Sequence, residues 1–375
     1  MMEWKFKRFA LPTIVATTIS CSSMLLVSAC TQAQDWWTMS DADFAAEYST
    51  MALNDDVEGQ SEVAWMLFSR VNQRVNFNGK DFSQWEIWPS NEDTFSPAVK
   101  AFSVENKVRT RPHLQEPKIF LAAQHQPMAA KFSMPPNDGG EEVTRNLISY
   151  KYIMQKNLNS KAGVWNTLST SPKIDFPIGT VEIKGDWVNS AVDGAYQLVD
   201  STTNTTYSLL GLHIMAKMAP TPDDPFHSET PSWFWTTFEF KGNPGLANAQ
   251  SLITYPDQLS QAQYTKMLVQ SGLGKTAFVN YRSNGTQIRY SDAKNPNIIL
   301  GNTKMEDFAG VPDGSSPDKW TAWNSSCHTC HGTTSGNPTI KAFYPFTVST
   351  GKITDPKIDK FTSLDFVWSI AFHAR

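Results

Sequence analysis

The stretch Gly179-Thr-Val-Glu-Ile-Lys-Gly-Asp-Trp-Val188 indicates the fold class most clearly, because apolar and polar side chains alternate along it. Side chains of a β-strand point alternately to the two faces of a sheet, so this alternation predicts a half-buried strand. Two later segments, residues 207–218 and 233–240, are rich in the apolar, β-branched and aromatic residues that strands favour. Together these three segments predict an antiparallel sheet in the middle of the chain.

The segments around this region predict a loop and a hairpin. Residues 219–231 contain four prolines, which lack the amide hydrogen that a central strand needs. We expect two further strands at 276–281 and 286–290, joined through Ser283-Asn284-Gly285. Asn-Gly is a strong signal for a hairpin turn, because both residues adopt positive φ readily.

Helical patterns precede the sheet. After Ser61-Glu62, apolar residues recur at helical spacing, and a second such pattern runs from residue 141 to about residue 158. The residues of the first pattern are Val63, Trp65, Met66, Phe68 and Val71. We therefore expect an α+β protein with N-terminal helices and a central antiparallel β-sheet.

The N-terminus has the features of a targeting segment. Lys5, Lys7 and Arg8 precede a mostly apolar stretch that ends in Val27-Ser28-Ala29-Cys30. This ending resembles a bacterial lipobox, in which the cysteine is acylated and becomes the new N-terminus. An ordinary signal peptide and an uncleaved anchor are the alternatives. We expect a lipoprotein signal peptide over residues 1–29 and lipidation at Cys30.

Location and domain organisation follow from this interpretation. The chain is expected to be exported and lipid-anchored to a membrane, facing the periplasm. Thr31, instead of aspartate, follows the cysteine and favours the outer membrane. Residues 30–58 are then a tether and N-terminal segment, and residues 59–375 form a single α+β domain.

Composition narrows the partners and suggests a use for the aromatic residues. The 375 residues carry a formal net charge of -4, and no basic run follows the N-terminus. Nucleic acid is not expected as a partner, because phosphate binding needs clustered Lys and Arg. Thirteen tryptophans are many for this length. They fit a Trp-rich core or the aromatic walls around a flat cofactor.

The run Cys327-His-Thr-Cys-His331 is a C-x-x-C-H motif, which is typical of c-type haem attachment. Cys327 and Cys330 would form thioethers with the porphyrin vinyl groups, and His331 would be the proximal iron ligand. One motif predicts one covalent haem c. Zinc normally needs a second pair of ligands, and a thioredoxin-like redox pair needs a βαβ pattern. Neither is visible in the sequence.

The late position of the motif indicates where the haem pocket comes from. Only 44 residues (375 minus 331) follow His331, and none of them is methionine. This tail lacks the downstream methionine that a small cytochrome c uses as its distal ligand. The expected fold therefore ends in a C-terminal covalent haem-attachment segment, and the upstream region encloses the haem.

The sixth iron position has several candidates. His213 and Met215 lie on the same face of the predicted strand, so either is a candidate distal ligand. Five-coordinate iron, without a distal protein ligand, is the alternative. Other histidines and methionines considered for this position are Met218, Met305, His113, His125, His227 and His373.

Aromatic and basic residues are candidates for the haem surroundings. Trp233 and Trp235 share one strand face, and Trp320 and Trp323 lie just upstream of the motif. Packing in an ordinary core is an equally good explanation for them. Arg282 is a candidate partner for a haem propionate, because a guanidinium forks onto carboxylates, or else a structural arginine.

Several short motifs, taken together, are similar to those of a family of bacterial cytochrome c proteins over roughly residues 60–375. Members are exported monohaem proteins with a C-terminal C-x-x-C-H motif. The resemblance implies covalent haem and export, and it names no reaction. Phe240 stands where the family is expected to have histidine. The motifs are Gly211-Leu-His213, Trp233-Phe-Trp-Thr-Thr-Phe-Glu-Phe240, Asn280-Tyr281-Arg282, Gly285-Thr286-Gln287, Leu300-Gly301-Asn302, Ser325-Ser326 before the haem motif, and Leu364-Asp-Phe-Val-Trp-Ser369.

Two classes of function remain open on the sequence. The first is periplasmic electron transfer to or from a redox partner protein, which predicts six-coordinate haem. The second is a haem oxidoreductase acting on a small-molecule substrate, or haem-based gas binding or sensing, which predicts open or weakly ligated iron. We expect electron transfer, because a mobile carrier is the commonest role of a C-x-x-C-H chain.

Overall fold

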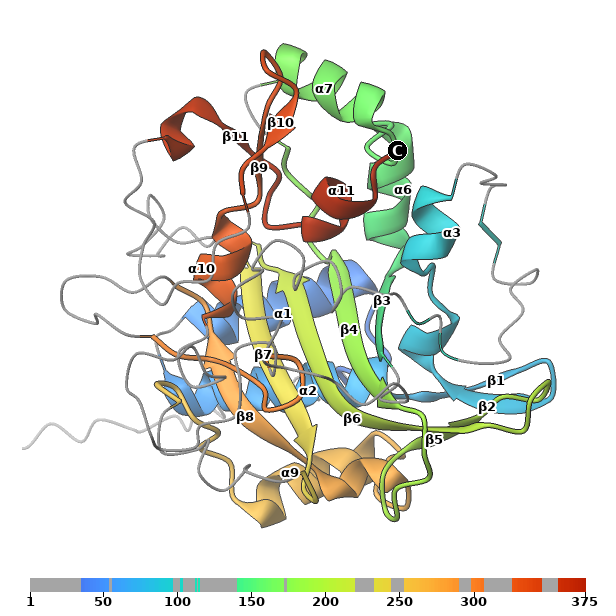
Figure 1. Cartoon of the computed structure of the whole chain (residues 1–375). Coiled ribbons are helices and arrows are strands. Elements are labelled where there is room, and N and C mark those ends of the chain that lie inside the picture. The colour runs from blue at the N-terminus through green and yellow to red at the C-terminus, as the bar shows by residue number, and fades with distance from the viewer. Residues whose placement is uncertain are drawn as a thin grey trace, which may run out of the picture. The chain divides into compact units, whose positions relative to one another are not determined.

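The three central segments form neighbouring strands of one six-stranded antiparallel sheet in the computed structural model (Figure 1). The strand order is β3-β4-β6-β7-β8, and β5 pairs with β6. The predicted α+β class and central antiparallel sheet are confirmed. The strands are β3 (Gly140–Arg145), β4 (Val181–Val188), β5 (Gln197–Val199), β6 (Thr206–Lys217), β7 (Trp233–Phe240) and β8 (Tyr281–Gln287).

The structure describes most of the chain after residue 34. The described residues are 35–53, 56–96, 102–103, 112, 114, 140–171, 174–219, 233–243, 253–289, 298–306, 326–345 and 357–375. Residues 35–375 form one compact unit. The predicted signal peptide, Cys30, most of the proline-rich segment, Trp320 and Trp323 lie outside the described residues.

The predicted hairpin at residues 276–290 is wrong. Residues 277–280 form the 3-10 helix η3 (Ala277–Asn280), and β8 runs straight through Asn284-Gly285. The pairing of β7 with β8 shifts register after Thr237, and Gly285 has a φ of 129°. A Cβ at Gly285 would lie 2.2 Å from the carbonyl oxygen of Tyr255. Asn-Gly therefore makes a bulge inside a strand, where only glycine fits.

The predicted helix from residue 141 is wrong in its first part. Residues 140–145 pair with β4 as β3, and α6 (Leu147–Gln155) begins only after Asn146. The Asn146 side chain accepts a hydrogen bond from the amide of Ser149 at 3.1 Å, which caps the helix. An apolar pattern common to both elements concealed this strand-to-helix change.

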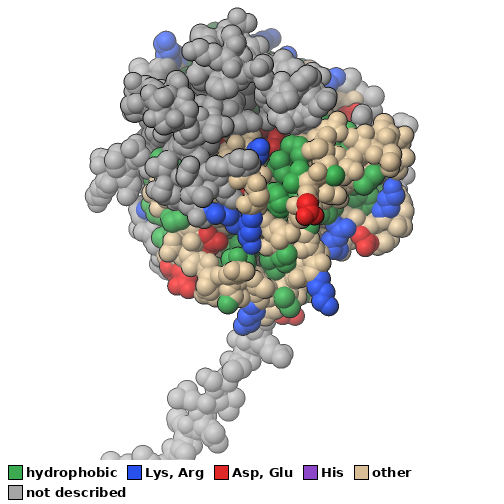
Figure 2. All heavy atoms as spheres, turned by 60° about the horizontal axis from the view of Figure 1, so that its bottom comes forward, with side chains coloured by type: hydrophobic (Ala, Val, Ile, Leu, Met, Phe, Trp, Pro, Cys, Tyr) green, Lys and Arg blue, Asp and Glu red, His purple; other side chains and the backbone are tan. Residues whose placement is uncertain are grey.

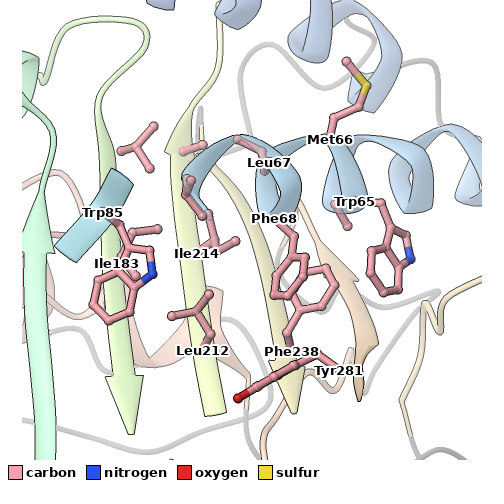
Figure 3. Close-up of a cluster of buried hydrophobic side chains, with 14 of the residues drawn as sticks. Trp65, Met66, Leu67, Phe68, Trp85, Ile183, Leu212, Ile214, Phe238 and Tyr281 are labelled. Atoms are coloured by element: carbon pink, nitrogen blue, oxygen red, sulfur yellow. The ribbon is translucent and has the colours of Figure 1, made fainter. Parts of the chain in front are cut away.

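One side of the sheet, the core face, is apolar and is covered by α1 (Asp41–Leu53) and α2 (Val57–Val71) (Figure 1). The second helix confirms the predicted pattern at residues 61–71, and Asp56 caps it. Its Phe68 ring stacks on Phe238 of β7, with ring centroids 4.1 Å apart (Figure 3). Ile183, Leu212, Ile214 and Phe238 alternate toward this helix, as strand geometry requires.

The opposite side of the sheet, the site face, carries the alternate residues. Lys184 of β4 pairs with His213 of β6, and Met215 of β6 pairs with Trp235 of β7. Strand β4 is buried at every residue except Lys184 and Val188, so the prediction of a half-buried strand is wrong. The polar alternation marks a second covered face and not a solvent-exposed one.

Shorter elements surround the sheet. Helices α6, α7 (Lys161–Thr170), α10 (Cys327–Gly332) and α11 (Trp368–His373) lie beyond the same end of the sheet (Figure 1). The remaining helices are η1 (Gln84–Ile87), α3 (Asn91–Phe95), α9 (Gln261–Gln270) and η6 (Ile358–Lys360). The remaining strands are the hairpin of β1 (Arg74–Phe77) and β2 (Lys80–Ser83), and a small sheet of β10 (Ala342–Phe343), β9 (Ser335–Asn337) and β11 (Thr362–Ser363).

On the face drawn in Figure 2, basic and acidic side chains of the described residues are interspersed among polar and apolar ones. Among the described helices, none combines the length and the apolar character needed to cross a membrane.

Candidate haem-attachment site

The C-x-x-C-H motif forms the short helix α10, which is fixed at its start by the end of β8. The Gln287 side chain donates a hydrogen bond to Ser326 Oγ at 2.8 Å and accepts one from the amide of His328 at 3.2 Å. Ser326 also forms a bridge with Leu300. One side chain from the sheet thus sets the position of the first helical turn.

Cys327 and Cys330 are free thiols on this helix and are not joined as a disulfide. Cys327 is 8% exposed, and its Sγ lies 3.6 Å from the carbonyl oxygen of Leu300. Burial raises the pKa of both thiols, that of Cys330 to about 12. Reactive redox cysteines have a lowered pKa. The environment therefore favours neutral thiols over a thioredoxin-like pair.

His331 is held in one tautomer by a backbone acceptor. Its Nδ1 lies 2.7 Å from the carbonyl oxygen of Phe366. A carbonyl only accepts, so Nδ1 carries the proton and Nε2 keeps its lone pair. Burial lowers the pKa of His331 to about 3 despite the Phe366 hydrogen bond, and Lys184 and His213 lower it further. The neutral imidazole is therefore ready to bind a metal ion through Nε2.

Trp235 packs directly against the motif. Its ring centroid lies 4.3 Å from that of His331 and 6.1 Å from that of His328. The side chain is 3% exposed, and its indole Nε1 has no hydrogen-bond partner among the described residues. Trp233 differs, because its Nε1 donates to Asp365 at 2.9 Å. Of the predicted tryptophans that the structure describes, Trp233 and Trp235, only Trp235 has a described contact with the C-x-x-C-H motif.

His213 lies on the site face and is held by Glu306. Its Nε2 is 2.8 Å from Glu306 Oε1, while its Nδ1 is buried and has no partner among the described residues. The second carboxylate oxygen of Glu306 accepts from the amide of Asn302. Glu306 and Lys184 both act electrostatically on Cys330, and Lys184 is itself paired with Glu141 at 2.8 Å. The structure thus brings His213 and the motif into one neighbourhood.

Of the candidate distal methionines, Met215 also lies near the motif. It is 3% exposed and packs in an apolar cluster that includes Cys327 and Trp235. Met218 belongs instead to the cluster on the core face, and His373 packs against Phe95. His113, His125 and His227 lie outside the described residues.

Arg282 lies on β8, and its Nε and Nη2 atoms are buried without a hydrogen-bond partner among the described residues, so its contact with a haem propionate stays a prediction. Arg282 pairs in register with Glu239, and its electrostatic partners are Glu239, Asp257 and Tyr264. Burial lowers the pKa of Arg282, and these groups act against that shift. The described residues that act electrostatically on Arg282 are thus carboxylates and a tyrosine of its own chain.

The residues at α10 fit a covalently attached haem in their chemistry. Two neutral thiols and a neutral imidazole with a free Nε2 lie on one short helix, against a tryptophan with an unsatisfied buried N–H group. A carboxylate–histidine pair stands nearby, with its second ring nitrogen unpaired among the described residues. Among the described residues, no group of three or more His, Cys, Asp or Glu side chains is placed to hold a metal ion by itself.

Comparison with known proteins adds no relative. No family model matches the chain, and neither the curated proteins nor the solved structures contain a significant match.

Sequence reasoning missed the residues that hold the site together. Gln287 and the segment 364–369 entered only as parts of the family resemblance, without a structural role. Glu306 was not singled out, because an acidic residue in an unpatterned segment gives no sequence signal. Their roles depend on contacts across 35 to 93 residues of chain, which only the folded structure defines.

Proposed function

We propose that this protein carries one haem c, bound covalently through Cys327 and Cys330, with His331 as the proximal iron ligand. The observation that carries the proposal is the hydrogen bond from His331 Nδ1 to the carbonyl oxygen of Phe366. Metal-ligating histidines characteristically donate their second ring N–H group to such an acceptor, which fixes the tautomer and the ring orientation. In a C-x-x-C-H motif, this hydrogen bond leaves Nε2 of the histidine as the nitrogen that can bind iron.

We propose electron transfer as the activity, with a redox protein as the partner. Haem c supplies one-electron exchange at iron when it is bound. Within the chain, Trp235 covers one side of the His331 ring and helps to exclude water from the buried motif. Gln287 and Phe366 hold the helix and the imidazole in place. A site held rigidly in this way changes little between two redox states.

His213 is the distal ligand that we propose. Glu306 holds its Nε2 at 2.8 Å and leaves Nδ1 as the nitrogen available to a metal. This carboxylate–histidine pair is the outer-shell arrangement that orients metal-binding imidazoles. Met215 packs among apolar side chains with Cys327. If His331 and His213 both held the iron, they would leave no room on it for a small molecule, so this pair would suit a carrier better than a small-molecule oxidoreductase or a gas sensor.

Absorption spectra of the oxidised and reduced protein, with and without carbon monoxide, test the activity. We expect low-spin spectra that carbon monoxide leaves unchanged. His213→Ala should convert the iron to a high-spin form that binds carbon monoxide, whereas Met215→Leu should keep the original spectrum. High-spin iron with carbon monoxide binding in the unmodified protein would contradict the carrier and favour the oxidoreductase or gas-binding alternative.

Covalent attachment is tested separately by mass spectrometry of the protein made in a host that attaches haem c. Cys327→Ser together with Cys330→Ser should abolish the covalent adduct. A control variant, Ser169→Ala, changes the hydroxyl of an exposed serine on α7 and should keep the adduct. Covalent haem retained in the double variant would refute the attachment proposal.

We also propose export and lipid anchoring at Cys30, supported by the targeting pattern of residues 1–30. Labelling with a radioactive fatty acid should mark the unmodified chain and not Cys30→Ser. Fractionation of the host cells should then place the labelled chain with the outer membrane. Label on the variant, or none on either chain, would contradict the anchor.

A further inference from the structure

A tight turn after the small sheet holds the histidine of the motif. The amide of Val367 donates to the carbonyl of Leu364 at 3.2 Å, and the two central residues, Asp365 and Phe366, have φ values of 53° and 69°. Both lie in the left-handed region, which side chains other than glycine, asparagine and aspartate seldom occupy. Such a turn persists only where surrounding contacts hold it.

The contacts that hold this turn converge on the carboxylate of Asp365. Both of its oxygens accept from Lys217 Nζ, at 2.9 and 2.7 Å. Oδ1 also accepts from Trp233 Nε1 at 2.9 Å, and Oδ2 from the amide of Phe176 at 2.7 Å. Lys217 is 4% exposed and Asp365 is 8% exposed. One buried ion pair thus ties the turn to the ends of β6 and β7.

Residues of the same turn form hydrogen bonds with the haem motif. The carbonyl of Phe366, directly after Asp365, accepts from His331 Nδ1 at 2.7 Å. On either side of it, Leu364 donates to the carbonyl of Thr334 at 2.9 Å and Trp368 Nε1 donates to the carbonyl of Cys330 at 3.1 Å. The direction of the His331 ring therefore depends on the conformation of Asp365 and Phe366.

We propose that Asp365, through its ion pair with Lys217, is a positioning residue for His331. The ion pair keeps the turn in its left-handed conformation, and the turn keeps the Phe366 carbonyl on Nδ1. This contact fixes the tautomer and makes the imidazole a stronger donor to a metal. The inference rests on the proposed function for its effect on haem, and on the contacts above for its effect on His331.

The first test measures the midpoint reduction potential of the haem-loaded protein. A stronger imidazole donor stabilises ferric iron, so loss of the contact should raise the potential. Asp365→Asn keeps the size and the tolerance for positive φ but loses the charge. We expect a positive shift in Asp365→Asn and Lys217→Gln, and a potential close to that of the unmodified protein in Lys217→Arg, which restores the cation. Asp175→Asn is the matched control, because Asp175 also pairs with Lys217 at 2.9 Å but is half-exposed and outside the turn.

The second test needs no haem. In the full-length chain with both motif cysteines changed to serine, nitrogen NMR of labelled histidine should show His331 as a single Nδ1-protonated tautomer. Adding Asp365→Asn should give a mixture of tautomers, and adding Asp175→Asn should not. If Asp365→Asn does not fold, Lys217→Gln and Lys217→Arg carry the same comparison.

The two tests separate the positioning inference from the proposed function. An unmodified protein without covalent haem would end the proposed function, while the tautomer comparison would still decide the positioning of His331. Folded Asp365→Asn and Lys217→Gln proteins with the tautomer and the potential of the Asp175→Asn control would overturn the inference.

Discussion

The core face and the site face belong to the same strands but bury different chemistry. The core face packs aliphatic and aromatic side chains such as Ile214 and Phe238 against α2 (Figure 3). The site face buries charged and polar groups next to Trp233 and Trp235, and three of its basic side chains are paired with carboxylates. The pairs are Lys184 with Glu141, His213 with Glu306, and Lys217 with Asp365.

The difference shows how one sheet serves two purposes. An unpaired buried charge costs several kcal/mol of folding free energy. Charges on the site face are therefore paired with residues that are distant in the sequence. The core face needs only volume and apolar surface, which local patterns supply. Substitutions on the core face should therefore destabilise the fold by leaving cavities, and those on the site face by leaving buried polar groups without partners. Four predictions test this division.

The largest effect is expected from Phe68→Ala on the core side. Phe68 is fully buried and contacts Phe238 and Phe278, so truncation removes a ring and leaves a cavity. We expect a loss of about 3–5 kcal/mol in the free energy of unfolding. Urea unfolding of the haem-free double-serine protein measures it. Val269→Ala, at a residue 60% exposed, should stay within about 0.5 kcal/mol. Equal losses in the two variants would contradict the assignment of the core.

A pair of identical substitutions sharpens the comparison on the site face. Trp233→Phe and Trp235→Phe remove the same ring from two buried positions of β7. Only Trp233 donates to a described partner, the carboxylate of Asp365. In the haem-free protein, Trp233→Phe should therefore cost about 1.5–3 kcal/mol more than Trp235→Phe. The same urea titration measures both, and a larger loss in Trp235→Phe would reverse the assignment.

A smaller effect is expected in acid from His373. Burial lowers the pKa of His373 to about 4 from an ordinary 6.5, with Arg145 and Arg375 lowering it further. Between these values the unfolded chain binds a proton that the folded chain lacks, so stability falls as pH drops from about 6.5 to about 4. The contribution of neutral His373 is complete above pH 6.5. His373→Gln should flatten the dependence of the melting temperature on pH in this window, and an unchanged slope would contradict it.

The smallest effect on the site is expected from Arg282→Gln. The groups that act electrostatically on Arg282 are Glu239, Asp257 and Tyr264, and none of them is part of the motif. The absorption spectrum and the midpoint potential of the haem-loaded protein should therefore match those of the unmodified chain. A changed midpoint potential would instead support the predicted contact between Arg282 and a haem propionate.

The sequence allowed the fold class and the main strands to be predicted, because these follow from local patterns. The segments at 181–188, 206–217 and 233–240 form strands, and residues 57–71 form a helix. The sequence pattern gave a wrong prediction in two situations. In one, a strand and the following helix share the same apolar spacing; in the other, hydrogen bonding to a neighbouring strand outweighs the tendency of two residues to form a turn. Asn284-Gly285 is an example, since its place in the ladder is set by β7 and by Tyr255.

The candidate site could be predicted only at its chemical centre. Cys327, Cys330 and His331 are adjacent in sequence, so their motif is visible without a structure. Glu306 and Asp365 contribute through contacts with His213 and Lys217, 93 and 148 residues away. No pattern in the sequence around Glu306 or Asp365 predicts either contact.

Helix α10 is held both by residues that precede it in the sequence and by residues that follow it. This arrangement bears on the order in which the chain folds around the motif. Gln287 at the end of β8 and Leu300 contact it from the residues that precede it, whereas Phe366 and Trp368 contact it from the last described residues. Cys327 is buried and Cys330 partly buried once these contacts have formed. On the proposed function, attachment of haem would therefore be expected to precede docking of residues 364–375.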